Sequence, residues 1–454
     1  MFMQKFNDLS RKKTARTLAL LLIFVFSPAT ANAQQANPTT IINAARILDV
    51  KSGKYLNNYA VLVVDGRVGQ IAPRAELARN APRGAKIVNL PPNATLLPGL
   101  IDAHTHLLDE RLLMQEFYDN NAVRITQRSP EERMALGERN AREMVEAGWT
   151  TVRDVGMAKD CDSLKLRDRI NAGQTIGPRM FVACKLLTPP GGLLLRPASE
   201  YAEEMIRNEY FEIRTEEDAR RAVGENVQAG ADVIKVVVAD EERMLTLPQV
   251  RAIVEAAHQA NLKVAGHAHT AEAAQIAVDG GVDSVEHAFQ VRDATLRQMR
   301  ERGIFLVPTD LSVAAINELF ARMLPPGFEP RPGIKKYRKE QVESAPERLK
   351  RAIAMKVRLA AGSDVQWIWT GRTRGTASLL ILDAFRQAGM SPLDVIRAAT
   401  VNSAELLGQS ENVGAIETNK FADLIAVEGD PLANFAALKR VVFVMKNGEI
   451  LKNR

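Results

Sequence analysis

Eight short apolar segments alternate with longer amphipathic segments along most of the chain. The amphipathic segments are typical of helices; one of them, TEEDARRAVGENVQAGA, begins at Thr215, which is a favourable N-cap residue. Regular alternation of strand and helix predicts an α/β fold in which a parallel sheet closes into a barrel. The predicted strands cover residues 97–108, 149–156, 179–187, 233–238, 263–270, 284–288, 304–310 and 358–365.

Both ends of this region are flanked by segments with the alternating pattern of half-buried strands. The N-terminal segment carries the turn signal Asp65-Gly66, and the C-terminal segment carries Asn447-Gly448. Such dipeptides between apolar runs predict β-hairpins. The two segments could be unrelated hairpins, but their bracketing of the strand–helix region favours one small shared domain.

The first 33 residues have the three parts of a secretory signal peptide. A basic region ends at Arg16, an apolar core covers residues 18–26, and Ala31-Asn32-Ala33 offers a cleavage site before Gln34. The apolar core is too short to span a bilayer, so we expect no stable membrane anchor. The sequence predicts export, with the bacterial periplasm as the destination.

Composition and charge narrow the class of protein. The 454 residues are 46% hydrophobic and 25% charged, which is an ordinary globular balance. The formal net charge of +6 falls to +2 without residues 1–33, so no electrostatic argument favours nucleic-acid binding. The two cysteines, Cys161 and Cys184, could pair in an oxidising compartment or remain as two buried free thiols.

Polar residues gather where the predicted strands end. Five of the six histidines lie there, together with an aspartate; these residues are His104, His106, His267, His269, His287 and Asp364. Only His258 lies on a predicted helix. Active sites of such barrels form at the carboxyl ends of the strands, and neutral imidazole is a common metal ligand. The HxH pair alone is also compatible with two strand histidines that make ordinary hydrogen bonds.

Lys235 lies inside the apolar strand at residues 233–238. A charged lysine is costly to bury unless it is paired or neutralised. One interpretation is a buried ion pair, for example with Asp154 on the second strand. The other is a lysine carbamylated by carbon dioxide, an anionic ligand that could bridge two cations. Its position alone leaves both open.

The segments LPGLIDAHTHL, ADVIKVV, GHAHT, SVEHA and AAGSD, in this order, resemble the amidohydrolase superfamily. They are most similar to its binuclear imidazolonepropionase and Xaa-Pro dipeptidase-like branch. The resemblance extends over nearly all of the chain after the signal peptide. It implies a (β/α)8 TIM barrel at residues 96–410. It also implies a small β-sandwich domain built from residues 34–95 and 411–454.

The resemblance also implies a set of ligands for two divalent metal ions. His104, His106 and Asp364 would bind the first ion, and His267 and His287 the second. Lys235, as N6-carboxylysine, would bridge them. His269 would be a neighbour that touches substrate or has a structural role. Zinc is the default ion for such ligands, although manganese and cobalt suit them as well.

The implied activity is hydrolysis of a C–N amide bond by a metal-bridging hydroxide, with Asp364 handling the proton. Deamination is disfavoured, because similar single-metal deaminases have Glu where this chain has Thr270. Similar enzymes cleave N-acyl amino acids, dipeptides or aryl amides of the ochratoxin type. Hydrolysis of a cyclic amide remains an alternative, as does a non-catalytic binding protein on the same scaffold. We expect a small-molecule amide as partner, and a homo-oligomer.

Two loops are candidates for substrate contacts. The loop after the third strand is apolar at residues 193–195 and ends in Arg196. The loop after the eighth strand carries two tryptophans followed by two arginines, Arg372 and Arg374. Apolar surface beside guanidinium groups would suit an amide whose amino-acid half bears a carboxylate. Alternatively, these loops only pack against each other or against a neighbouring subunit.

Overall fold

The computed structural model describes residues 39–111, 127–192, 199–239, 243–323, 327, 329 and 332–453. These residues belong to one compact unit, residues 37–454, which is distinct from residues 1–36. The predicted signal peptide and the loop segment 193–196 lie outside the described residues. In the described part of the chain, no helix is both long and apolar enough to cross a bilayer.

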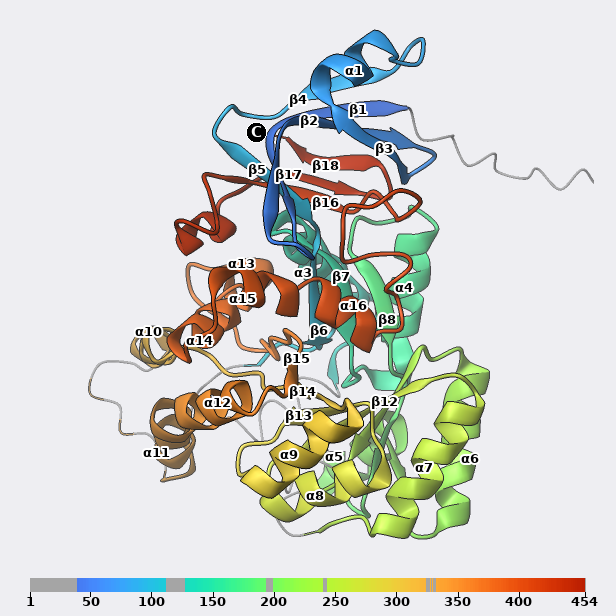
Figure 1. Ribbon diagram of the computed structural model, residues 1–454. Helices are drawn as coiled ribbons and strands as arrows, with labels where there is room; N and C mark the ends of the chain where they lie inside the picture. Colours follow the sequence, from blue (N-terminus) through green and yellow to red (C-terminus); the bar gives the residue numbers. More distant parts are fainter. Residues whose placement is uncertain are drawn as a thin grey trace, which may run out of the picture. The chain divides into compact units, whose positions relative to one another are not determined.

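The two ends of the described chain form one mixed sheet of eight strands. Its order is β18-β17-β16-β5-β1-β2-β3, and β4 also pairs with β1. The N- and C-terminal segments meet where β5 runs antiparallel to β16, with Leu97 opposite Ile425. Figure 1 shows these blue and red strands side by side. The strands are β1 (Thr40–Asp49), β2 (Lys54–Val64), β3 (Arg67–Pro73), β4 (Lys86–Asn89), β5 (Ala94–Pro98), β16 (Leu424–Glu428), β17 (Val441–Lys446) and β18 (Glu449–Asn453).

Both predicted hairpins are present in this sheet. Asp65 and Gly66 have φ angles of 48° and 77°, and they join β2 to β3. Asn447 and Gly448, with φ angles of 49° and 77°, join β17 to β18. Two consecutive positive φ angles define the turn whose twist matches that of the flanking strands, which explains the Asp-Gly and Asn-Gly sequences.

The strand–helix region forms parallel sheets with the strand order of a TIM barrel. One sheet has the order β6-β7-β8, and the other has the order β10-β9-β11-β12-β13-β14-β15. Their strands are β6 (Leu100–Thr105), β7 (Trp149–Asp154), β8 (Arg179–Val182), β9 (Leu186–Thr188), β10 (Tyr210–Glu212), β11 (Val233–Val237), β12 (Lys263–Ala268), β13 (Ser284–His287), β14 (Phe305–Val307) and β15 (Arg358–Leu359). All eight predicted strands are therefore found, with the third divided into β8 and β9.

The strand ladders are interrupted at two seams, where backbone hydrogen bonds join the sheets. At one seam, Ala103 N donates to Ala361 O at 2.7 Å and Asp364 N donates to His104 O at 2.8 Å. At the other, Asp232 N donates to Val182 O at 2.8 Å. The first seam brings the end of the eighth predicted strand directly beside the end of the first.

Amphipathic helices cover the parallel strands on the outside. Figure 1 shows α7 and α8 alongside β12, and α9 next to β14. Thr215 caps α6 as predicted, since its side chain accepts a hydrogen bond from Asp218 N. The principal helices are α3 (Pro130–Glu146), α4 (Asp162–Asn171), α5 (Ser199–Glu209), α6 (Glu216–Ala229), α7 (Leu247–Gln259), α8 (Ala271–Gly280), α9 (Asp293–Arg302), α10 (Val313–Met323), α11 (Pro332–Lys339), α12 (Ala345–Ala354), α13 (Arg374–Ser378), α14 (Ile381–Gln387), α15 (Pro392–Ala398) and α16 (Val401–Leu406).

The two cysteines form a disulfide. Cys161 immediately precedes α4, and Cys184 lies in the short break between β8 and β9. Their Cα atoms are 4.7 Å apart, within the range for a disulfide. The sequence left free thiols as an alternative, and the structure supports the pair.

Candidate active site

The structure brings the predicted site residues together at the carboxyl ends of the parallel strands. The rings of His104 and His287 have centroids 5.0 Å apart, and those of His267 and His287 are 4.5 Å apart. His258 is excluded from this group. It is exposed on α7, and its Nε2 lies 2.8 Å from an Asp283 carboxylate oxygen.

His104 and His106 are each oriented by a hydrogen bond at Nδ1. His106 Nδ1 lies 2.8 Å from the carbonyl oxygen of Gly156, and His104 Nδ1 lies 2.7 Å from Glu286 Oε2. Both partners accept hydrogen bonds, so Nδ1 carries the proton in a neutral ring and Nε2 keeps its lone pair. The two Nε2 atoms lie 3.7 Å and 3.4 Å from Asp364 Oδ1. This is the arrangement that a metal ligand needs.

Sequence reasoning missed the two charged residues behind His104. Glu286 is fully buried, and its Oε1 accepts a hydrogen bond from Arg153 Nη2 at 2.8 Å. Arg153 Nε donates to the carbonyl oxygen of Ala103 at 2.6 Å. Burial would raise the pKa of Glu286, but Arg153 and His104 lower it to about 2. The available signal was the same as for Lys235, namely a charged residue inside an apolar strand.

A second group of histidines lies at the carboxyl ends of β12 and β13. His267, His269 and His287 each offer a ring nitrogen, and these atoms lie within 4.8 Å of one another. His287 Nδ1 lies 2.8 Å from Thr309 Oγ1, whose hydroxyl donates to Pro308 O. Thr309 Oγ1 therefore accepts a hydrogen bond from the Nδ1–H of His287, and Nε2 of the neutral ring is left unprotonated. His269 reaches solvent and stacks at 4.7 Å on Phe289.

Lys235 makes no ion pair with Asp154, so that alternative from the sequence is wrong. The Asp154 carboxylate accepts hydrogen bonds from Leu107 N at 2.7 Å and Ser163 Oγ at 3.0 Å instead. Lys235 is only 2% exposed, and within the described residues its Nζ has no hydrogen-bond partner. Burial lowers its pKa to about 8, although Glu286 and Asp364 oppose the shift. An unpaired, weakly basic amine deep in the site fits the carbamate better than the ion pair.

Asp364 lies between the histidine groups. The structure also groups it with His104 and His287, because one ligand atom from each lies within 4.8 Å of the others. Its side chain is 25% exposed, whereas the His104 side chain is 1% exposed, so the carboxylate faces the open side of the site. Gln366 Nε2 donates to Asp364 Oδ1 at 2.6 Å. Burial would raise the pKa of Asp364, but His104, His106 and Lys235 hold it well below its usual range.

Two observations indicate that these residues fit divalent metal ions. Burial lowers the pKa of His104 to about 4, and it lowers those of His267 and His287 well below the usual value, so the rings are neutral donors. In addition, the buried His267 Nε2 has no hydrogen-bond partner within the described residues, like Lys235 Nζ. Imidazole nitrogen with carboxylate oxygen suits zinc, manganese or cobalt.

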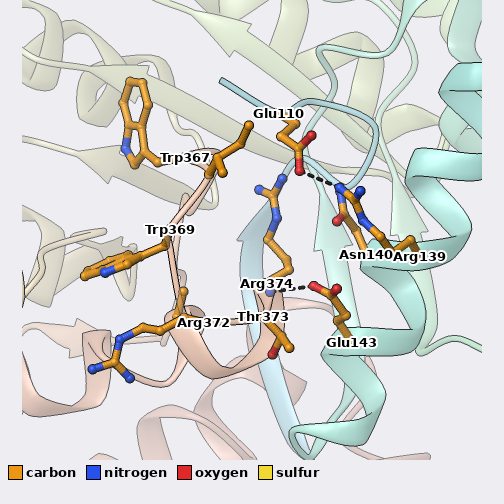
Figure 2. A pocket seen from close by; sticks show the side chains of 11 residues that line it. Glu110, Arg139, Asn140, Glu143, Trp367, Trp369, Arg372, Thr373 and Arg374 are labelled. Atoms are coloured by element: carbon orange, nitrogen blue, oxygen red, sulfur yellow. Dashed lines mark hydrogen bonds and ion pairs between the residues drawn. The ribbon is translucent and has the colours of Figure 1, made fainter. Parts of the chain in front are cut away.

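The loop after the eighth predicted strand does not offer its arginines to a substrate carboxylate. Arg372 donates to both carboxylate oxygens of Glu318, at 2.9 and 2.7 Å. Arg374 is buried, and its guanidinium donates to the backbone carbonyl oxygens of Val365 and Asp109. Figure 2 shows a pocket formed by this loop and α3, with Trp367 and Trp369 at one side. None of the seven predicted site residues lines it.

Comparison with known proteins decides the family. A profile of the Amidohydrolase family matches residues 95–451, which is most of the chain. The protein belongs to the Amidohydrolase family. Members of the Amidohydrolase family are hydrolytic enzymes with a TIM-barrel fold, and they are typically metal-dependent. The predicted fold class is thereby confirmed.

Relatives within the Amidohydrolase family cover nearly the whole chain. Ochratoxinase of Aspergillus niger is 26% identical over 451 residues, which cover 93% of this chain and 88% of the relative. Imidazolonepropionase of Shewanella frigidimarina (strain NCIMB 400) is 26% identical over 425 residues, with 86% and 92% covered. A crystal structure of a Xaa-Pro dipeptidase with bound methionine in the active site has a TM-score of 0.76 and 26% identity. It covers 91% of this chain and 99% of the dipeptidase.

Proposed function

We propose that the protein is a binuclear metal-dependent hydrolase that cleaves a C–N amide bond. The observation that carries the proposal is the convergence of His104, Lys235, His267 and Asp364 with the other site histidines at one end of the strands. The buried nitrogens Lys235 Nζ and His267 Nε2, which lack a hydrogen-bond partner among the described residues, support it, because such atoms are costly to bury unless a ligand binds them. Relatives and structural neighbours named for action on amides also support it.

The proposed ligands are the set that the sequence predicted. His104, His106 and Asp364 would hold one ion, His267 and His287 the other, and carbamylated Lys235 would lie between them. Bound divalent ions make water nucleophilic near neutral pH and polarise a carbonyl oxygen. Asp364 accepts the proton of the attacking water as the C–O bond forms. It then delivers that proton to the nitrogen as the C–N bond breaks.

The substrate classes we propose are N-acyl amino acids, dipeptides and aryl amides of the ochratoxin type. The full-length match to ochratoxinase and the similarity to a Xaa-Pro dipeptidase support this choice. Ring opening of a cyclic amide is the second candidate, supported by the match to imidazolonepropionase. A binding protein without activity is disfavoured, because the chain keeps every proposed ligand. As partners we propose the small-molecule substrate and further copies of the chain in a homo-oligomer, but no nucleic acid.

A substrate screen with the purified enzyme tests this function. We expect at least one of N-acyl amino acids, dipeptides, ochratoxin-type amides or cyclic amides to be cleaved with water as co-substrate. The measurement is amino acid released by the linear amides, or ring opening of the cyclic ones. Activity should disappear after treatment with a chelator and return with zinc or manganese. Cleavage that survives complete metal removal, or no cleavage of any class by metal-loaded protein, would contradict the proposal.

We further propose that the protein is exported, and this predicts the N-terminus of the mature chain. The basic, apolar and Ala-Asn-Ala segments of residues 1–33 support export, and so does the Cys161–Cys184 disulfide, because disulfides persist in oxidising compartments. N-terminal sequencing of protein from the periplasmic fraction should begin at or near Gln34. Protein that retains Met1 and fractionates with the cytoplasm would overturn this proposal.

A further inference from the structure

Arg111 is attached by its backbone to the segment that carries Asp364. Its N–H donates to the carbonyl oxygen of Gln366 at 2.8 Å, and its own carbonyl oxygen accepts from Ile368 N at 2.9 Å. These bonds form an isolated parallel bridge opposite Trp367. The Gln366 side chain donates a hydrogen bond to Asp364. The backbone of Arg111 is therefore hydrogen-bonded to a residue that itself contacts the residue expected to carry the proton.

The Arg111 guanidinium is hydrogen-bonded through Nε, while its two terminal nitrogens make no hydrogen bond to a described residue. Nε donates to Asp109 Oδ2 at 2.6 Å, and the Asp109 side chain is fully buried. No described residue accepts a hydrogen bond from Nη1 or Nη2 of Arg111, and neither nitrogen is fully buried. The side chain is 14% exposed. The two terminal nitrogens are therefore accessible and available to an acceptor that is not part of the described chain.

Electrostatics keep this guanidinium positive at the edge of the site. Burial would lower the pKa of Arg111, but Asp109 raises it above its usual value, and the nearby Asp364 adds to that effect. Arg372 and Arg374 differ from it, because their guanidinium groups already donate to Glu318 and to backbone carbonyls. Arg111 is therefore the better candidate of the three to bind an anion.

We infer that Arg111 binds the carboxylate of the amino-acid half of the substrate, in a position fixed by Asp109. This inference rests on the proposed amide hydrolysis and narrows its substrate to amides that bear a carboxylate next to the scissile nitrogen. Two parallel N–H groups match the two oxygens of a carboxylate. In an N-acyl amino acid the carboxylate is one carbon away from that nitrogen. A cation that binds it must therefore lie near Asp364, which protonates the nitrogen.

Equilibrium binding in a catalytically silent background tests this assignment. The background is the metal-loaded Asp364→Asn protein, and the probes are N-acetyl-L-phenylalanine and its C-terminal amide, which differ only in the carboxylate. Calorimetry should show that the acid binds on the order of 10- to 100-fold more tightly than the amide, as expected for a charge-assisted hydrogen-bonded pair. Adding Arg111→Met should remove this difference, whereas Arg111→Lys should keep part of it.

Two further variants keep the test decisive. Arg372→Met, which removes a guanidinium on the neighbouring loop, should leave the acid preference unchanged. Arg111→Met leaves the buried Asp109 without its partner, so Arg111→Met with Asp109→Asn should repeat the result without a buried unpaired charge. Thermal unfolding checks that each variant is folded.

The outcomes separate this inference from the proposed function. Retention of the acid preference in both Arg111→Met variants would overturn it, as would equal binding, or no binding, of acid and amide by the background protein. If Arg111 controls acid binding while the parent enzyme cleaves no amide, the assignment of Arg111 stands and the proposed reaction fails. If the parent enzyme cleaves amides but the preference for the acid is unchanged by replacement of Arg111, the proposed reaction stands and the assignment of Arg111 fails.

Discussion

Replacement of Asp364 by Asn is expected to leave a folded protein that has lost most of its turnover. Asp364 is the proposed proton carrier, and general acid–base assistance is worth roughly 10²–10⁴-fold in rate. A weakened bond to metal would add to that loss. The measurement is kcat on the best amide from the screen, made at saturating divalent metal, because reduced metal affinity alone would imitate a lost proton carrier.

Asparagine is the appropriate replacement for structural reasons. The backbone of Asp364 has φ of 50°, a conformation that Asn and Asp adopt more readily than most other residues. Asn also keeps an oxygen that can accept the hydrogen bond from Gln366 Nε2, now 2.6 Å from Asp364 Oδ1. The variant therefore removes the titratable oxygen with little disturbance of the loop, and its thermal unfolding should stay close to that of the parent.

His258→Asn is the matched control for this experiment. His258 is exposed on α7 and contacts Asp283, away from the histidine cluster. Its turnover should stay within a few-fold of the parent. An Asp364→Asn enzyme that cleaves amide at the parental rate would refute the proton-carrier role and leave the fold assignment intact.

The sequence predicted the fold well because most of the strands are short, largely apolar segments followed by polar residues. β7, β11, β12 and β13 all lie inside their predicted ranges. The third strand was predicted as one element, but it breaks between β8 and β9 where Cys184 forms the disulfide. The eighth strand was predicted to cover residues 358–365, but β15 is shorter. Residues 360–364 make isolated backbone hydrogen bonds to both neighbouring strands and do not form a continuous ladder.

The site was predictable only where residue type and strand position coincide. Histidines are few in this chain, so their positions at strand ends carried information. The hydrogen-bond partner of a buried charged residue could not be predicted in this way. Lys235 Nζ has no hydrogen-bond partner among the described residues, and Asp154 accepts hydrogen bonds from Leu107 and Ser163 instead. The tertiary fold decides which acceptor a long side chain meets. The same reason explains why the sequence left open whether Arg372 contacts substrate or only packs against its surroundings; in the structure its guanidinium donates to Glu318.

Replacement of Lys235 by Met should lower both the metal content and the turnover without unfolding the protein. Methionine suits the buried, apolar strand β11 and removes a buried amine that has no hydrogen-bond partner in the described part of the chain, so stability should be kept or increased. If carbamylated Lys235 bridges two ions, elemental analysis should fall from close to two divalent ions per chain to one or fewer. Loss of a metal ion would remove several kcal/mol of transition-state stabilisation, so we expect kcat to decrease by at least about 10²-fold.

Lys263→Met supplies the matched control, because Lys263 begins the neighbouring strand β12 at its far end, opposite Val233. Its side chain is 48% exposed and pairs with Asp283, so its loss should change neither metal content nor turnover. A small carboxylate such as acetate should restore part of the activity of a Lys235→Ala enzyme, since it supplies the anionic oxygens that a carbamate would provide. An unmodified Lys235 in a parent enzyme with a single ion, or a Lys235→Met enzyme with two ions and parental kcat, would show that no carbamate bridges this site.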